Sequence, residues 1–478
     1  MKFSKAFKLG KPQGALDFVD VSTSYDTRVF LDPYAIEIKQ NVLALECAAY
    51  VHSYFNAVLD ALRAGRTHRA RELTEHLSEP KDTFIGVSKG KPKGRGVGRE
   101  QADHLLSALR RSRAFETGLL ADLSETELMV EGVGRDKVSD LTTNIIREKL
   151  VEYTIGQCDL LEIDLGDRTY PSGPMWDPSS QAWKEEYVKR PIVRGKPVLL
   201  IPKHFVRLNL SLNSQEFYNY HMLEFLQAEH ISAGSSLVQF FRKSKKPYVT
   251  KKSLKRVRPK RKDDVVDFIR EHPHVLEVYK NLKGAEGALQ DRQIDPDFNE
   301  RRFAEALIEE LERLPRGMKA AGKYHSLMTG VLPFLFYPNL IQPVKEREIH
   351  SGRKRIDLSF TNAAESGFFS TVLARPQTRA SWVMIECKNY SSDLGNPELD
   401  QMSGRFSPAR GKFGIICCRE LVDAQLMLRR CRDTARDDRG HIITLEDSDI
   451  VDMLKGVVGL RRRRIDEILH AKLSQLAE

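Results

Sequence analysis

The chain of 478 residues has few aromatic residues (8%), six cysteines and no long apolar run. No stretch reaches the roughly 20 apolar residues that a membrane-spanning helix requires. Residues 1–9 mix lysines with apolar residues, which is not typical of a secretory signal. The cysteines are scattered without a Cys-x-x-Cys pair, so we expect neither a disulfide framework nor a structural zinc site. These absences predict a soluble, cytoplasmic protein with no membrane partner.

Composition bounds the number of domains and the class of partner. Hydrophobic residues make up 41% of the chain, which is enough for packed cores. Because a single core rarely grows beyond about 250–300 residues, we expect more than one domain. The net charge of +10, from 76 basic and 66 acidic residues, makes nucleic acid a candidate partner without identifying one.

Changes in sequence texture predict three regions. Residues 1–240 are expected to form a mostly helical recognition or sensing domain, with helical periodicity over 44–63 and 101–121. Residues 241–296 are expected to form a basic connector with one helix. Residues 297–478 alternate helical patterns with short apolar runs, which predicts an α/β (α+β) domain.

In residues 297–478, short apolar runs bounded by polar or turn residues are typical of strands, and longer amphipathic stretches are typical of helices. We expect residues 362–381 to form an extended connection between the first two predicted strands. The predicted strands are 355–360, 382–387, 413–418 and 441–445, and the predicted helices are 301–314, 324–336, 397–406 and 420–436.

Charged residues in two neighbouring predicted strands carry the chemical signal. Because side chains alternate along a strand, Glu386 and Lys388 share one face while Cys387 points to the core. Asp357 lies in the preceding strand, and it can approach Glu386 if the two strands pair. Two carboxylates and the backbone carbonyl of Cys387 make a hard oxygen site suited to Mg²⁺. A lysine beside such a site can orient an attacking water.

This pattern resembles the PD-(D/E)xK nuclease superfamily, the fold of many restriction endonucleases, over about the last third of the chain. Asp357 matches its first carboxylate, and Glu386 to Lys388 match its E-x-K tripeptide. The resemblance implies a restriction-endonuclease-like mixed sheet flanked by helices. It implies Mg²⁺-dependent hydrolysis of DNA, with Mn²⁺ as a substitute. It also implies a supporting catalytic role for Gln401 on a helix capped by Asn396, and nucleic-acid contact by Arg405 one turn later.

Two departures from the superfamily leave alternatives open. Ile356 stands where many members have proline, and His325 stands where many have a helix glutamate. The site then works without that acid, takes Glu305 or Glu309 from an earlier helix, or is weakened. The competing interpretation is a nucleic-acid-binding scaffold or regulator with an inactive nuclease-like fold.

The resemblance also sets expectations about partners and biological setting. DNA is the favoured substrate and RNA stays open as an alternative. A homodimer is the default expectation, because many superfamily members cut as dimers. An activating partner or ligand could engage residues 1–240. A nuclease joined to an unfamiliar recognition domain suggests bacterial restriction or anti-phage defence, which is an analogy from fold.

Two basic segments are further candidates for nucleic-acid contact. Residues 88–99 form a glycine-rich loop whose charges are all basic, without the Lys-Ser ending of a P-loop. Between residues 242 and 262, 12 of 21 residues are lysine or arginine and none is acidic. A solvated surface is the alternative for both. The residues predicted to contact nucleic acid are Lys89, Lys91, Lys93, Arg95, Arg99, Lys251, Lys252, Lys255, Arg256 and Arg258.

Overall fold

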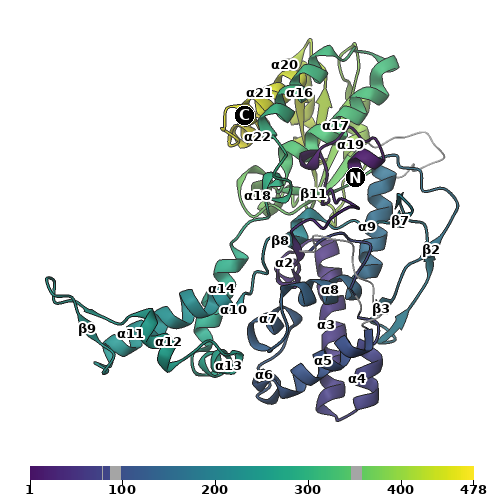
Figure 1. Ribbon diagram of the computed structural model, residues 1–478. Helices are drawn as coiled ribbons and strands as arrows, with labels where there is room; N and C mark the ends of the chain where they lie inside the picture. Colours follow the sequence, from purple (N-terminus) through teal and green to yellow (C-terminus); the bar gives the residue numbers. More distant parts are fainter. Residues whose placement is uncertain (78, 87–97, 346–357, 478) are drawn as a thin grey trace. The chain divides into compact units, whose positions relative to one another are not determined.

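The computed structural model describes residues 1–77, 79–86, 98–345 and 358–477, and the chain divides into two compact units (Figure 1). The sheet unit comprises Met1–Asp20, Tyr153–Gly166 and Gln290–Glu478, and the helical unit comprises Val21–Glu152 and Asp167–Leu289. The predicted α/β (α+β) class is confirmed: a mixed sheet lies in the carboxy-terminal part and the amino-terminal part is mostly helical.

The sheet unit is built around five strands in the order β11-β12-β13-β14-β15. The first three strands run antiparallel to their neighbours, whereas β13, β14 and β15 run parallel. Every residue of β14 is buried, as expected for a central strand that is covered on both faces. The strands are Leu340–Val344 (β11), Leu358–Asn362 (β12), Trp382–Lys388 (β13), Phe413–Cys418 (β14) and His441–Glu446 (β15).

Helices cover this sheet and complete its core. α17 packs against β11 and β13, α18 packs against β12, and α20, α21 and α22 pack against β15. A single apolar core joins these helices to all five strands. The helices are α1 (Phe3–Ala6), α15 (Asp291–Ile294), α16 (Glu300–Arg313), α17 (Ala321–Phe336), α18 (Gly367–Ala374), α19 (Asn396–Ser403), α20 (Ala424–Arg436), α21 (Asp447–Val458) and α22 (Arg464–Ser474).

The strands and helices predicted for this unit are present, but two details were wrong. The connection 362–381 contains α18, whose eight residues are too few for a helical period to stand out in sequence. Asn396 is the first residue of α19 rather than its cap. The cap position is Gly395, whose backbone N–H donates to Glu398 Oε2 at 2.8 Å.

Over residues 21–77, 79–86, 98–152 and 167–289, the helical unit contains many short helices and five two-stranded sheets. The sheets pair β1 (Phe30–Leu31) with β8 (Val206–Arg207), β2 (Tyr170–Pro171) with β5 (Tyr187–Val188), β3 (Met175–Asp177) with β4 (Ala182–Lys184), β6 (Ile192–Val193) with β7 (Lys196–Pro197), and β9 (Gln239–Phe240) with β10 (Pro247–Tyr248). The helices are α2 (Pro33–Glu37), α3 (Val42–Arg63), α4 (Thr67–Thr74), α5 (Gly98–Arg111), α6 (Arg113–Glu116), α7 (Thr126–Met129), α8 (Arg135–Ile145), the start of α9 (Arg147–Leu160), α10 (Ser214–Phe217), α11 (Leu223–Ser232), α12 (Lys251–Val257), α13 (Lys262–Glu271) and α14 (Pro273–Gly284).

The helix predicted over 44–63 corresponds to α3, whereas the single helix predicted over 101–121 was wrong. The helix is interrupted at Ser112, which separates α5 from α6. The Ser112 hydroxyl accepts a hydrogen bond from the backbone N–H of Ala114 at 3.2 Å and so starts a second helix.

Within the described ranges, α3 is the one helix long and apolar enough to cross a membrane by length and composition. Nine of its residues are buried, and the hydroxyl of Tyr54 donates to the carbonyl of Leu73 at 3.1 Å. A core helix of a folded domain has the same features, so its length and composition do not by themselves indicate a membrane span. The cytoplasmic location stays a prediction.

The two units differ from the three predicted regions. Segments 1–20 and 153–166 belong to the sheet unit, and residues 241–289 belong to the helical unit instead of forming a separate connector. Hydrogen bonds between distant residues explain the first difference. Asp17 accepts from the backbone N–H of Gln342 at 3.0 Å and from the hydroxyl of Tyr153 at 2.7 Å. Such bonds leave no trace in local composition.

Candidate functional site

Glu386 and Lys388 lie at the carboxyl end of β13 and share one face of the sheet. Glu386 is fully buried, and its Oε2 lies 2.9 Å from Lys388 Nζ. Leu358, the first residue of β12, pairs with Ile385, the residue before Glu386. The two strands that carry the motif are therefore antiparallel neighbours over their described residues.

Arg405 is the third member of this cluster. Its Nη1 donates to Glu386 Oε1, and the arginine side chain is only 8% exposed. Glycine at position 414 lets the preceding helix α19 lie close to β14, because a Cβ there would be 2.6 Å from the sulfur of Met402. Arg405 was predicted to contact nucleic acid. In the structure its side chain is buried and bonded to Glu386 instead.

The cluster is a buried carboxylate between two cations. An uncompensated charge at this depth would cost several kcal/mol, so Lys388 and Arg405 allow Glu386 to be buried as a carboxylate. A charge-assisted hydrogen bond from Arg405 to Oε1 and the ion pair of Lys388 with Oε2 fix the orientation of the carboxylate. This arrangement can hold an ammonium group beside a ligand oxygen, which is the geometry required to position a water or a phosphate oxygen.

A polar network at the ends of the three parallel strands was missed in the sequence. Asn389, Arg419 and Asp447 each directly follow β13, β14 or β15. Arg419 donates to Asn389 Oδ1 at 2.9 Å and to Asp447 Oδ2 at 2.5 Å. The Asn389 amide also donates to the carbonyl of Gly317 at 2.8 Å, before α17. Burial raises the pKa of Asp447, while its bond to Arg419 opposes that rise. The repeated polar residue after each strand was the available signal.

The remaining predicted site residues are only partly described by the structure. Asp357 lies outside the described residues. Gln401 is half-buried on α19, and His325 is half-buried on α17. Glu305 and Glu309 were the alternatives for the missing acid. Both are exposed on α16, where each pairs with an arginine of its own helix, at 3.0 and 2.9 Å respectively.

The predicted nucleic-acid contacts are described in part. Lys89, Lys91, Lys93 and Arg95 lie outside the described residues, and Arg99 is in the first turn of α5. On α12, Lys252, Lys255 and Arg256 are exposed. The two flanking cations of this segment are engaged with acidic residues: Lys251 pairs with Glu224 at 2.8 Å, and Arg258 with Glu271 at 3.7 Å.

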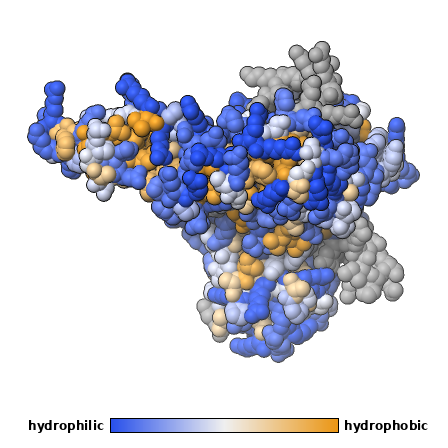
Figure 2. Space-filling model, turned by 90° about the horizontal axis from the view of Figure 1, so that it is seen from below, coloured by the Kyte–Doolittle hydropathy of each residue, from blue (hydrophilic) through white to orange (hydrophobic). Residues whose placement is uncertain are grey.

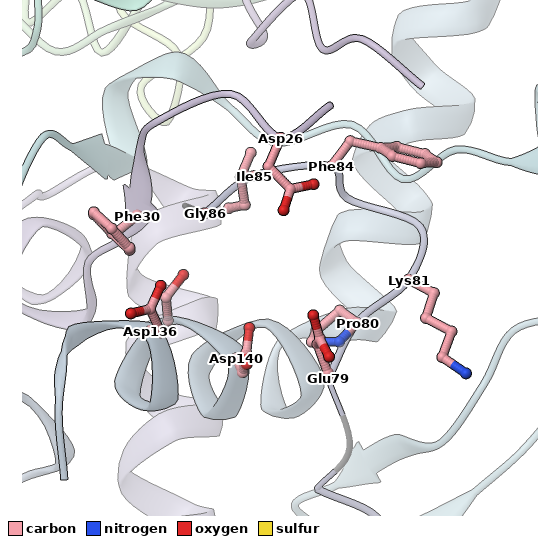
Figure 3. A pocket seen from close by; sticks show the side chains of 11 residues that line it. Asp26, Phe30, Glu79, Pro80, Lys81, Phe84, Ile85, Gly86, Asp136 and Asp140 are labelled. Carbon is pink, nitrogen blue, oxygen red and sulfur yellow. The ribbon is translucent and has the colours of Figure 1, made fainter. Parts of the chain in front are cut away.

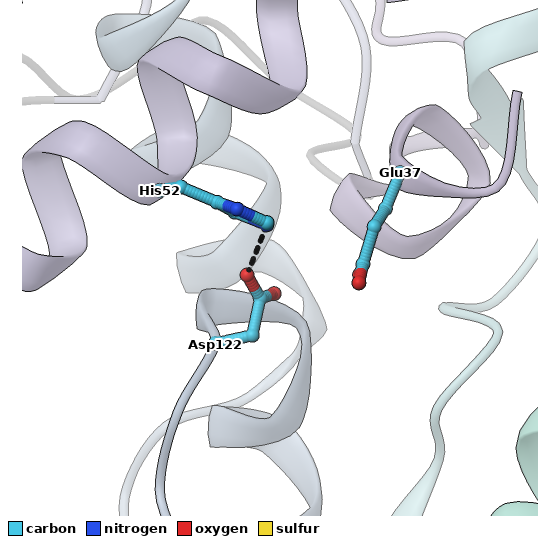
Figure 4. Close-up of side chains that lie close together, drawn as sticks. All are labelled: Glu37, His52 and Asp122. Carbon is cyan, nitrogen blue, oxygen red and sulfur yellow. Dashed lines mark ion pairs between the residues drawn. The ribbon is translucent and has the colours of Figure 1, made fainter. Parts of the chain in front are cut away.

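The helical unit holds a second cluster with metal-ligand chemistry, formed by Glu37, His52 and Asp122 (Figure 4). Their potential ligand atoms lie within 4.8 Å of one another. His52 Nε2 pairs with Asp122 Oδ2 at 3.0 Å, and this hydrogen bond raises the pKa of His52. Burial and the charge of Asp122 raise the pKa of Glu37 to about 7. The three residues lie on separate elements without a motif spacing, so sequence patterns could not reveal them.

An acidic pocket of about 210 Å³ lies elsewhere in the helical unit (Figure 3). Four carboxylates line it, from Asp26, Glu79, Asp136 and Asp140, and the side chain of Lys81 points away from it in this view. Burial and the three neighbouring carboxylates raise the pKa of Asp140 to about 8. The pocket therefore favours cations and protons over anions.

Comparison with known proteins supports no functional assignment. Residues 8–213 match a family described as a domain of unknown function (DUF8370). Neither the curated proteins nor the solved structures contain a significant match to the chain. The matched segment includes the Glu37 cluster and the acidic pocket but stops well before β13.

Asp140 gives a testable pH dependence. Its folded pKa lies above the unfolded value, so the folded state binds the additional proton and stability falls as the pH rises from about 4 to 8. We expect Asp140→Asn to raise the free energy of unfolding at pH 8 and to flatten its pH dependence, by up to about 1.4 kcal/mol per pH unit. Urea unfolding at a series of pH values measures this. Asp60→Asn, at a position 64% exposed on α3, is the control and should leave the slope unchanged.

Proposed function

We propose that the chain is a metal-dependent endonuclease that hydrolyses phosphodiester bonds of DNA in the cytoplasm. Its active site would lie at the carboxyl end of β13, with Glu386, Lys388 and the sequence-predicted Asp357 as central residues. The observation that carries the proposal is the pairing of buried Glu386 with Lys388 at 2.9 Å on a strand flanked by antiparallel β12 and parallel β14.

The topology supports this proposal independently of the tripeptide. One helix, α17, precedes an antiparallel run of β11, β12 and β13, and α19 then leads to the parallel strand β14. The superfamily resemblance implies the order helix, strand, strand, helix, strand, which α17, β12, β13, α19 and β14 follow, with β11 and α18 as additional elements. An E-x-K tripeptide on an exposed strand would carry little weight, whereas Glu386 is fully buried and its neighbours are specified by the sheet register.

The donor set of the cluster fits Mg²⁺, with Mn²⁺ as a substitute. Glu386 provides hard carboxylate oxygens, which both ions prefer, and Cys387 adds a backbone carbonyl on the same strand end. The buried carboxylate already requires positive charge beside it, at present from Lys388 and Arg405. Glu386, the carbonyl of Cys387 and Asp357 would hold the ion. When bound, it would lower the pKa of water and stabilise charge on the phosphate.

The chain's own residues supply the remaining chemistry. Lys388 Nζ is held by Glu386, and the lysine side chain is only 13% exposed, so the ammonium group can orient a water at a fixed position or donate to a phosphate oxygen. Gln401 would support the substrate from α19. The bonds of Asn389 to Gly317 and Arg419 fix the chain directly after Lys388.

A second function, binding of nucleic acid without cleavage, is favoured by one observation. Glu386 is fully buried and bonded to Arg405, so its carboxylate is closed to solvent in this conformation. An enzyme would have to exchange this arginine contact for a metal, whereas a scaffold would keep it as a structural ion pair.

Incubation of the full chain with supercoiled plasmid, linear DNA and single-stranded RNA, each in Mg²⁺, Mn²⁺ and EDTA, separates these functions. We expect metal-dependent nicking or cutting of DNA, and loss of it in Glu386→Gln. The glutamine keeps the shape of the side chain while it removes the charge. Cleavage of RNA alone would change the substrate class. Cleavage that survives Glu386→Gln would show that the activity comes from elsewhere, and retained binding without any cleavage would favour the scaffold.

A further inference from the structure

The hairpin of β9 and β10 exposes two adjacent phenylalanines. Phe240 is 63% exposed and Phe241 is 52% exposed, although burying a phenylalanine side chain is worth about 1.5–3 kcal/mol. The Phe241 ring lies against Tyr248 with centroids 4.3 Å apart and an angle of 30°. In Figure 2, orange side chains lie among blue ones on the left part of the helical unit, where Figure 1 labels β9 and α12. Clustered exposed aromatics indicate a binding surface.

The same hairpin carries a dense positive charge. Residues 241–246 connect its strands, and the four basic side chains among them are exposed. Three more exposed cations follow on α12. Among the described residues, none of these seven takes part in an ion pair, in contrast to Lys251 and Arg258. The seven are Arg242, Lys243, Lys245, Lys246, Lys252, Lys255 and Arg256.

The hairpin is a folded platform and not a loose charged tail. Phe240 pairs with Pro247, and the backbone N–H of Phe241 donates to the carbonyl of Lys246 at 3.1 Å. The Gln227 amide of α11 donates to the carbonyl of Val249, whose side chain is buried. Phe240 and Phe241 are therefore presented on a fixed backbone, which reduces the conformational entropy lost on binding.

We infer that this hairpin binds single-stranded nucleic acid, with the phenylalanines stacking on unpaired bases and the seven cations contacting phosphates. Base stacking on aromatic rings beside a positive surface is the common mode of single-strand binding. A duplex offers its phosphates but keeps its base faces stacked, so it would use the charge without the phenylalanines. The inference stands on the hairpin itself and does not depend on Glu386 or Lys388.

Fluorescence anisotropy in EDTA tests it, because binding is then measured without metal-dependent cleavage. A labelled oligothymidylate, a duplex of matched length, and vesicles of phosphatidylglycerol and phosphatidylcholine are the three probes. We expect Phe240→Ala/Phe241→Ala to weaken oligothymidylate binding about 10- to 100-fold while the salt dependence is kept. Lys243→Gln/Lys245→Gln should make the negative slope of log K against log salt shallower by about 1.4, because two phosphates are then no longer neutralised by the protein. Tyr187→Ala, which removes another aromatic side chain that is 75% exposed, is the matched control and should have no effect.

Several results would overturn the inference. These are equal affinity of the double phenylalanine variant and the wild type, equal loss of duplex binding in that variant, and capture by vesicles but not by oligothymidylate. Far-ultraviolet circular dichroism confirms that each variant is folded. Because no cleavage is scored, a negative result here leaves the proposed nuclease intact, and an inactive Glu386→Gln protein can still bind through the hairpin.

Discussion

We expect replacement of Lys388 with methionine to lower the proposed Mg²⁺-dependent cleavage of plasmid DNA by about 10³-fold, which corresponds to about 4 kcal/mol in the activation barrier. The reason is chemical: the ammonium group lies 2.9 Å from Glu386 Oε2, and methionine fills similar space without a charge or a donor. Losses of about 10²–10⁴ are usual when a group that positions or moves a proton is removed. Single-turnover cleavage with excess protein measures the chemical step directly.

The matched control for this experiment is Lys412→Met. Lys412 also pairs with a carboxylate, Asp438, at 2.7 Å, but its side chain is 35% exposed in the loop before β14. Cleavage should be unchanged there. Equal rates for Lys388→Met and wild type would contradict the assigned role. Binding of DNA in EDTA should be within a few fold of wild type, which separates a loss of chemistry from a loss of affinity.

The sequence predicted the sheet because its strands are apolar and bounded by polar residues. β13 and β14 are covered on both faces, so their composition alone identifies them. Strand β11 was not predicted, because it has only five residues and contains a proline, which lowers strand propensity. The division into units could not be predicted. It depends on contacts such as that between Asp17 and Gln342, which are 325 residues apart.

The candidate site was predictable only where its residues lie close together in the chain. Glu386 and Lys388 follow from strand alternation, and their strand is where it was expected. The position of Arg405 depends on the packing of Met402 over Gly414. This packing sets the position of the end of α19, which Arg405 closely follows. A surface arginine and a buried counter-charge have the same local sequence. Only the three-dimensional arrangement distinguishes them, and here it changed the role from substrate contact to partner of Glu386.

The pairing with Arg405 leads to the second large effect. In EDTA, Arg405→Met should lower the free energy of unfolding by about 3 kcal/mol, because it leaves the buried Glu386 carboxylate with less positive charge beside it. If Glu386 is a metal ligand, Mg²⁺ should restore much of this loss, since binding to the folded state stabilises it in proportion to RT ln(1 + [L]/Kd). Wild type should gain less, because Arg405 already provides the charge that the ion would bring. Urea unfolding at several Mg²⁺ concentrations measures both effects.

The double variant Glu386→Gln/Arg405→Met identifies the source of the effect. It removes the carboxylate that would bind the ion and leaves Lys388, whose side chain is 13% exposed, as the one charge of the three-residue cluster. The double variant should therefore lose the response to Mg²⁺ that Arg405→Met alone shows. A response to Mg²⁺ that persists without Glu386 would place the ion elsewhere, for example at the Glu37, His52 and Asp122 cluster. An Arg405→Met protein that is destabilised but indifferent to Mg²⁺ would show that the ion pair is structural. Glu386 would then not be a metal ligand, and a nucleic-acid-binding scaffold without cleavage would be the better interpretation of this fold.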